Sequence, residues 1–125
     1  MNRMYDEKRA PAYCVLYPAI SRIAREFGYA CTIHGSLVTD LDVVLIPWVE
    51  EAADAADVVE AVRLAIGGVK RTYDVQPYPK PHGRLSWTFY LLAAGETDHT
   101  CSTPYVDISV TPSHMSQNSE TTDIK

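Results

Sequence analysis

The sequence predicts an α+β fold, an α/β sandwich in which two helices pack on a mixed sheet of about five strands. Apolar residues recur at helical spacing in two segments, each of which ends at glycine. The run LDVVLIP at 41–47 is continuously apolar and β-branched, which is typical of a strand covered on both faces. Two later segments, 85–92 and 105–111, have the composition of strands. The resulting order, α-β-β-α-β-β-β, favours helices packed on a sheet.

The first helix is predicted to follow a polar, frayed N-terminus at residues 1–10. Its apolar side chains recur every three to four residues from Val15 to Phe27, with charged residues on the other face. Pro18 either opens this helix in its first turn or kinks it, because proline lacks the N–H that a helix interior needs. Gly28 is expected to end it.

The second helix is predicted to begin after Asp54, which we expect to be its N-cap, and to end at Gly67. The segment QPYPKPHG at 76–83 is rich in proline, so it is predicted to be a loop that cannot pair in a sheet. The predicted strands cover 29–34, 41–47, 69–75, 85–92 and 105–111. A polar turn is expected over 93–104. We expect one domain over residues 1–112 and a polar, disordered tail over 113–125.

Composition narrows the classes of function. The chain has 125 residues and a net charge of −5, which argues against nucleic-acid binding by broad neutralisation of phosphates. Three widely spaced cysteines form no CxxC pair, so a zinc site built on thiolates is not expected. Without a signal-peptide pattern or an apolar run of transmembrane length, the expected location is the cytoplasm, with no membrane partner.

Three aspartates form the candidate catalytic and metal-binding site. Asp40 and Asp42 lie two residues apart at the entry of a strand, so their side chains point to the same face. Asp107 lies between Val106 and Ile108 in an apolar strand, where a lone carboxylate is costly unless it is paired or metal-bound. If the two strands are neighbours, the crowded carboxylates raise at least one pKa, and Mg²⁺ or Mn²⁺ relieves the repulsion. Carboxylates at this spacing suit the two-metal arrangement of phosphoryl-transfer enzymes.

Phosphate-binding groups are predicted at two places. Gly35 and Ser36 follow the first strand directly, and the amides of such a turn, with the serine hydroxyl, can hold a phosphate. Lys80, His82 and Arg84 cluster in the proline-rich segment KPHGR. Arginine grips phosphate with a fork of donors. Two alternatives are that these three residues form a solvated loop, and that Arg84 neutralises one of the aspartates directly.

The motifs IHGS at 33–36, DLDV at 40–43 and VDI at 106–108 resemble, in this order, the signature of the nucleotidyltransferase fold. The resemblance covers roughly residues 18–112. It implies that Ser36 contacts nucleotide phosphates and that Asp40 and Asp42 bind two Mg²⁺ ions. Asp107 then shares one metal and helps to deprotonate the acceptor hydroxyl. The segment HGSLVTDLDVVLIPW is also similar to small proteins carried by phages and prophages, which would place the chain in the host cytoplasm.

The resemblance implies a nucleoside triphosphate as substrate and a protein, an RNA or a small molecule as acceptor. Only residues 37–39 separate the Gly-Ser turn from the aspartates, where the family has a short helix that presents amides to the triphosphate. The basic segment KPHGR is therefore expected to hold the triphosphate. Two alternatives are an inactive nucleotide-binding or sequestering protein, and an interaction or antitoxin-like domain with a vestigial site.

Several other residues have simpler interpretations. His34 is expected to be a satisfied core histidine. Trp48 and Trp87 are expected to pack in the core or at its rim. The cysteines are expected to be small buried apolar groups.

Overall fold

The structure is a computed structural model that describes residues 9–70, 76–91 and 104–113. It has a mixed five-stranded sheet with the strand order β1-β2-β5-β4-β3, in which β2 and β5 are parallel and the other neighbours antiparallel. The predicted α+β class is therefore confirmed. The elements are α2 (Arg9–Glu26), β1 (Tyr29–His34), β2 (Asp40–Pro47), α3 (Ala55–Ile66), β3 (Tyr78–Pro79), the 3-10 helix η2 (Pro81–Gly83), β4 (Leu85–Tyr90) and β5 (Tyr105–Val110).

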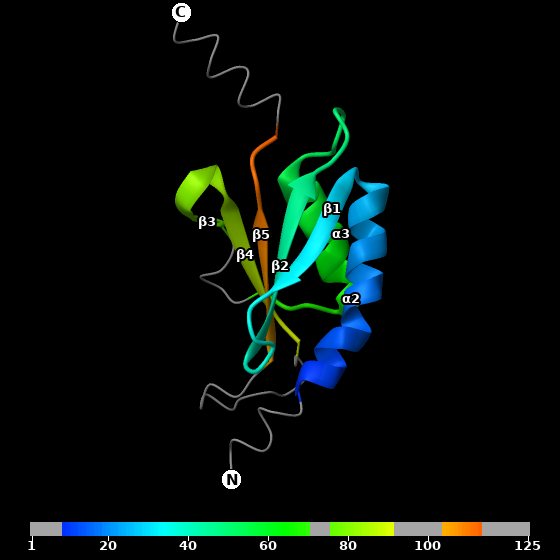
Figure 1. The fold of residues 1–125 in the computed structure, drawn as a ribbon, viewed down its shortest axis with the longest axis vertical. Coiled ribbons are helices and arrows are strands. Elements are labelled where there is room, and N and C mark those ends of the chain that lie inside the picture. Colours follow the sequence, from blue (N-terminus) through cyan, green and yellow to red (C-terminus); the bar gives the residue numbers. More distant parts are fainter. Residues whose placement is uncertain (1–8, 71–75, 92–103, 114–125) are drawn as a thin grey trace, which may run out of the picture.

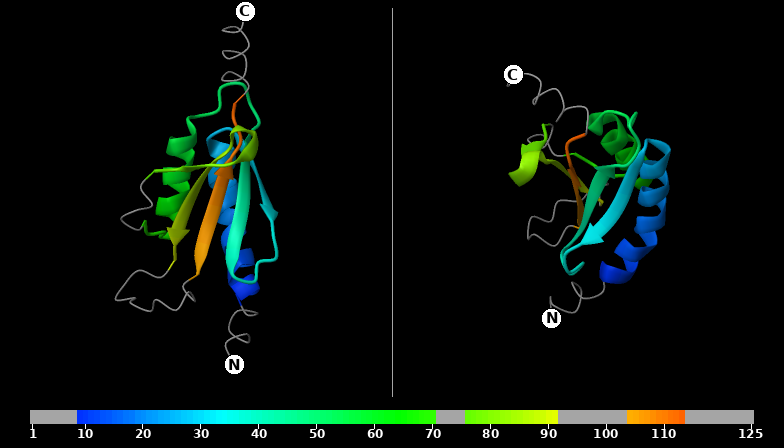
Figure 2. Two further views of the ribbon diagram at one scale, coloured as in Figure 1. Left: turned by 90° about the vertical axis from the view of Figure 1, so that its left-hand side faces the viewer. Right: turned by 45° about the horizontal axis from the view of Figure 1, so that its top comes forward.

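Both helices cover the same face of the sheet, as Figures 1 and 2 show. The strands follow this arrangement with a period of two. In β2, Leu41, Val43 and Leu45 are fully buried toward the helices, whereas Asp40 and Asp42 are half-buried on the other face. We call that second face the open face. The left view of Figure 2 looks onto it, and neither α2 nor α3 lies in front of the strands.

Helix α2 begins at Arg9, earlier than predicted, and Pro18 lies inside it. Contacts with the loop before β2 explain the early start. The hydroxyl of buried Tyr13 donates to the Thr39 carbonyl at 2.8 Å, and the Arg9 guanidinium donates to the same oxygen at 3.0 Å. These tertiary bonds stabilise the first turn, whose first two residues, Arg9 and Ala10, are predicted to be frayed. The helix ends before Gly28, as predicted, with φ 91° at that glycine.

Helix α3 follows its predicted bounds closely. It ends at Gly67, which adopts the left-handed conformation with φ 71°, and the Gly68 amide donates to the Arg63 carbonyl. Asp54 precedes the helix as expected, but its carboxylate forms no capping hydrogen bond. The apolar stripe of Val58, Val59 and Val62 is buried against the sheet.

The prediction that residues 76–83 cannot pair in a sheet is wrong. Tyr78 and Pro79 form the short strand β3, which pairs with Ser86 and Leu85 of β4. Proline is tolerated there because β3 is an edge strand, so its missing N–H need not serve a second neighbour. In the predicted strand 69–75, Val69 forms an isolated bridge to Tyr90. Residues 71–75, most of the turn predicted over 93–104 and the tail after 113 lie outside the described residues.

Two predictions about single apolar residues are also wrong. Trp48 is 74% exposed beyond the end of β2, and Cys14 lies on the exposed side of α2. Trp87 is buried, as expected. Cys31 is only half-buried, and this burial raises the pKa of its thiol to about 11. Cys101 lies outside the described residues. No helix in the described part of the chain is long and apolar enough to cross a membrane.

Candidate metal centre

Strand register brings the three predicted aspartates together on the open face. Because β2 and β5 are parallel neighbours, Asp42 lies directly opposite Asp107, and Asp40 lies opposite Tyr105. One carboxylate oxygen from each aspartate lies within 4.8 Å of the other two. Three half-buried carboxylates at this spacing form a set of hard oxygen ligands of the kind that Mg²⁺ and Mn²⁺ prefer. Their role as metal ligands stays a prediction.

The Asp107 carboxylate is held from the neighbouring strand β4. The hydroxyls of Ser86 and Thr88 each donate to Asp107 Oδ1 at 3.0 Å. Among the described residues, no side chain donates a hydrogen bond to Oδ2. Sequence reasoning missed both hydroxyls. The alternation in LSWTFY was the available signal, because it places residues 86 and 88 on the face opposite Trp87.

Repulsion and burial act on Asp42. Burial, followed by hydrogen bonding with Asp40 and the charges of Asp40 and Asp107, raises the pKa of its carboxyl to about 6. The nearby His34 acts in the opposite direction. The cluster therefore retains a proton more readily than separate carboxylates do. A divalent cation offers the same neutralisation, and its binding would compete with that proton.

Two further residues border the aspartates. His34 is not a core histidine, since it lies exposed at the end of β1, opposite Asp42 on the open face. Tyr105 lies beside the cluster: burial raises the pKa of its hydroxyl, followed by the charges of Asp40, Asp107 and Asp42. Its ring centroid is 5.5 Å from that of Tyr90. Sequence reasoning missed Tyr105, although its place two residues before Asp107 predicts the same face.

The Gly35-Ser36 turn packs against the cluster. Gly35 has φ 89°, and a Cβ at this position would lie 2.8 Å from Asp42 Oδ2. Only glycine therefore fits here without displacing the carboxylate. The Ser36 hydroxyl accepts a hydrogen bond from the Val38 amide at 3.3 Å, so it is used within the turn. Phosphate binding by this turn stays a prediction.

The basic segment lies at the other end of the sheet. Because β4 is antiparallel to β5, the start of β4 lies beside Val110 and far along the strand from Asp107. Figure 1 shows η2 at the upper left and the β1–β2 turn at the bottom. Lys80 and His82 are exposed there, so the structure does not bring them to the aspartates.

Arg84 alone of this basic group reaches back over the open face. Its guanidinium donates to Ser109 Oγ at 3.2 Å and to the Pro81 carbonyl at 3.0 Å. Ser109 is two residues beyond Asp107, so both side chains leave the same face of β5. Among the described residues, Arg84 forms no ion pair with the aspartates. The charge of Arg84 therefore lies beside Ser109, two residues along β5 from Asp107.

Comparison of the sequence with protein-family models and with the curated proteins finds no significant match. The chemistry of the centre therefore has to be inferred from its own geometry. That geometry consists of three converging carboxylates, two hydroxyls that orient one of them, and an adjacent arginine.

Proposed function

We propose that this chain is a metal-dependent nucleotidyltransferase-like protein. It binds a nucleoside triphosphate with Mg²⁺ and transfers the nucleotidyl group to a hydroxyl acceptor: the acceptor oxygen forms a bond to the α-phosphorus, the α–β phosphoanhydride bond breaks, and pyrophosphate leaves. The observation that carries the proposal is the convergence of Asp40, Asp42 and Asp107 within 4.8 Å on the open face of the sheet. A single row of exposed acids on a helix would not concentrate three ligand atoms in this way.

The donor set suits a hard divalent cation. Asp40, Asp42 and Asp107 would hold it with carboxylate oxygens, and the half-buried site leaves coordination positions for water and phosphate oxygens. Once bound, Mg²⁺ would neutralise charge on the phosphates and make a coordinated hydroxyl more acidic.

The chain's own residues orient the reacting groups. Ser86 and Thr88 fix Asp107 through Oδ1, which leaves Oδ2 to accept the proton of an acceptor hydroxyl. The Arg84 guanidinium, held by Ser109, offers its remaining N–H donors to an outer phosphate oxygen. Arg84→Ala should therefore weaken nucleotide affinity by about 1.5–3 kcal/mol, the usual contribution of a hydrogen bond to a charged group. Its affinity for Mn²⁺ without nucleotide should remain at the wild-type level.

A second candidate function is nucleotide binding without transfer. It is favoured by the short link of three residues between the Gly-Ser turn and Asp40, and by the distance of Lys80 and His82 from the aspartates. Fewer phosphate contacts would hold the triphosphate less rigidly, and transfer depends strongly on its orientation.

One experiment separates these candidates. The protein is incubated with Mg²⁺ or Mn²⁺ and α-labelled nucleoside triphosphates, with itself, RNA and polyols as acceptors, and covalent label is measured. We expect metal-dependent label that Asp107→Asn abolishes and that Glu51→Gln, an exposed carboxylate after β2, leaves unchanged. Metal-dependent binding without label supports the second candidate. If neither binding nor label is observed, both candidates are wrong.

A further inference from the structure

The two helices do not cover the whole of the sheet face against which they pack. A helix is about 10 Å across and strands are spaced about 4.8 Å apart, so two helices cover roughly four strands. Helix α2 packs against β1 and β2, and α3 packs beside α2. The start of β4, at Leu85, lies at the margin of the helix layer. Leu85 there is 38% exposed, although its side chain points to the helix side.

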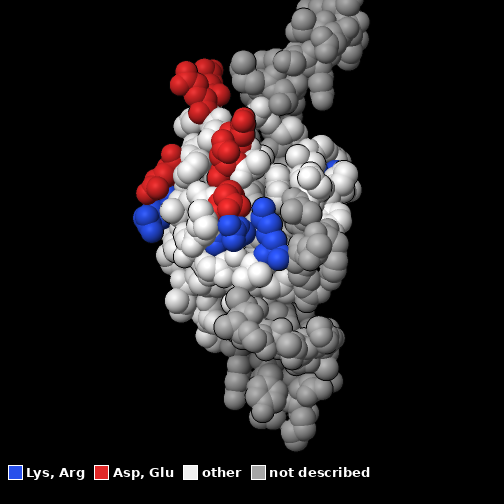
Figure 3. Space-filling view, turned by 180° about the vertical axis from the view of Figure 1, so that it is seen from behind, with Lys and Arg blue, Asp and Glu red and all other residues white. Residues whose placement is uncertain are grey.

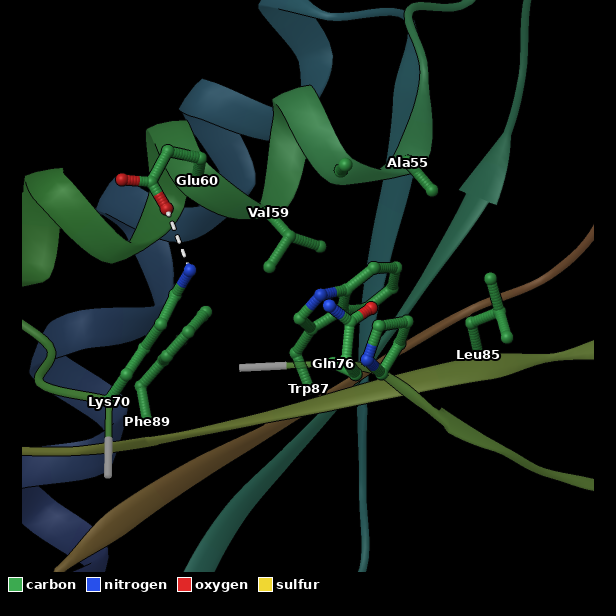
Figure 4. Close-up of a pocket in the computed structure, with 10 residues that line it drawn as sticks. Ala55, Val59, Glu60, Lys70, Gln76, Leu85, Trp87 and Phe89 are labelled. Carbon is green, nitrogen blue, oxygen red and sulfur yellow. Dashed lines mark ion pairs between the residues drawn. The ribbon is translucent and has the colours of Figure 1, made fainter. Parts of the chain in front are cut away.

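A cavity of about 470 Å³ lies at this margin, between α3 and β4. Figure 4 shows Val59 of α3 above it and Trp87 and Phe89 of β4 below. This volume falls within the range of small-molecule sites, which are mostly apolar with a few polar groups. The sheet separates the cavity from the aspartates, because Trp87 and Phe89 point to the opposite face from Thr88.

Trp87 supplies an unused hydrogen-bond donor. The residue is 93% buried, since only 7% of its surface is exposed, yet no described residue accepts a hydrogen bond from its indole N–H. Among the described residues, every side-chain nitrogen that is sealed from solvent has a hydrogen-bond partner. The indole nitrogen therefore keeps contact with solvent, and Trp87 is one of the residues that line the cavity. An occupant with an acceptor atom would satisfy it.

The polar side of the cavity carries a surplus positive charge. Arg63 binds both carboxylate oxygens of Glu60 through its guanidinium and so neutralises it. Lys70 also forms an ion pair with Glu60, at 3.7 Å, so Glu60, Arg63 and Lys70 together carry one net positive charge. On the face shown in Figure 3, acidic side chains run toward the centre and meet basic ones there. Figure 4 shows the Lys70–Glu60 pair at the edge of the cavity.

We propose that this cavity binds a small planar aromatic carboxylate. Its ring would pack against Trp87 and Phe89, its carboxylate would pair with Lys70, and a ring substituent would accept the indole N–H. An uncharged aromatic molecule would have the same apolar contacts but would lack the ion pair. A larger aliphatic acid would lose the contact of flat surfaces with the indole. This site is independent of the proposed metal centre.

A pair of matched probes tests the proposal: 6-hydroxy-2-naphthoate and its uncharged carboxamide. Both are titrated calorimetrically into the full chain in buffer with EDTA, which removes any contribution from the aspartates. We expect the carboxylate to bind about tenfold more tightly than the carboxamide, the effect of one charge-assisted contact. In Trp48→Phe, the remaining indole N–H resonance belongs to Trp87, and it should shift on binding.

Three variants complete the test. Lys70→Met should lower carboxylate affinity about tenfold and leave carboxamide affinity unchanged. Lys80→Met, on the exposed η2 segment, should change neither affinity. Ala56→Phe, at an exposed wall position, should fill the cavity and weaken both probes while the far-UV spectrum stays native. The proposal is wrong if neither probe binds, if both bind equally well, or if the Trp87 resonance does not move.

Discussion

At the scale of single residues, Asp42 shows that the crowding of three carboxylates lowers the stability of the folded protein when they are ionised. Its carboxyl is crowded by Asp40 and Asp107 and partly removed from water, so its pKa rises to about 6 from the ordinary value of 3.8. The folded protein thus holds this proton more tightly than the unfolded chain does. Stability that the protonated form provides below pH 4 is lost as the pH rises through 6.

Asp42→Asn should remove this pH dependence. In metal-free buffer at pH 7.5, the variant should melt about 3–5 °C above wild type, the shift produced by roughly 1 kcal/mol in a domain of this size. The difference should shrink steadily as the pH falls from 7.5 to 4, because wild-type Asp42 becomes protonated in the folded state over this range. Thermal melts from pH 4 to 8 with EDTA provide the measurement. Parallel pH profiles for the two proteins would contradict the crowding of charges.

Gly35 tests the packing of the turn on the same carboxylate. In Gly35→Ala, the positive φ should cost about 1–2 kcal/mol, and the methyl group, 2.8 Å from Asp42 Oδ2, should also displace that carboxylate. Gly67→Ala is a matched control, with φ 71° and no atom within 4 Å of the new Cβ. Both variants should lose stability in urea titrations, but only Gly35→Ala should lose Mn²⁺ affinity. Equal Mn²⁺ affinity in both would show that the turn does not position Asp42.

At the scale of elements, helix α2 anchors the loop that leads into β2. Tyr13 and Arg9 both donate to the carbonyl of Thr39, the residue directly before Asp40. The sequence predicts fraying at Arg9 and Ala10, because the stability of this first turn depends on contacts with a segment 26 and 30 residues away. Local propensity carries no information on such contacts. Strand β3 illustrates the same limit, since Pro79 pairs only because an edge is available.

Tyr13→Phe measures this anchor. Loss of the hydroxyl should cost about 0.5–1.5 kcal/mol, as for a typical hydrogen bond, and should loosen the entry to Asp40. Tyr17→Phe is a close control, since its hydroxyl donates to the Cys31 carbonyl at 2.7 Å on β1. Chemical denaturation should give similar losses for both variants. Mn²⁺ titration should show weaker binding for Tyr13→Phe alone. Unchanged binding in Tyr13→Phe would show that this hydrogen bond does not position Asp40 for the metal.

At the scale of the whole molecule, the convergence of the aspartates could be predicted, whereas the position of the basic group could not. The strand period of two fixes the common face of Asp40 and Asp42, and the Asp107 carboxylate is costly in an apolar strand unless it has partners. The position of Lys80 depends instead on the direction of β4 relative to β5. Their antiparallel pairing moves the start of β4 to the far end of the sheet. The same register places the hydroxyls of Ser86 and Thr88 beside Asp107.

The central claim is that Asp40, Asp42 and Asp107 bind a divalent cation. Calorimetric titration of Mn²⁺ at pH 7.5 into wild type, Asp42→Asn, Asp107→Asn and Glu51→Gln tests it most directly. We predict saturable binding in wild type and in Glu51→Gln, and at least about tenfold weaker binding in both aspartate variants, because each loses an anionic ligand. Affinity in Asp42→Asn and Asp107→Asn equal to that of wild type, or no binding by wild type, would contradict the claim.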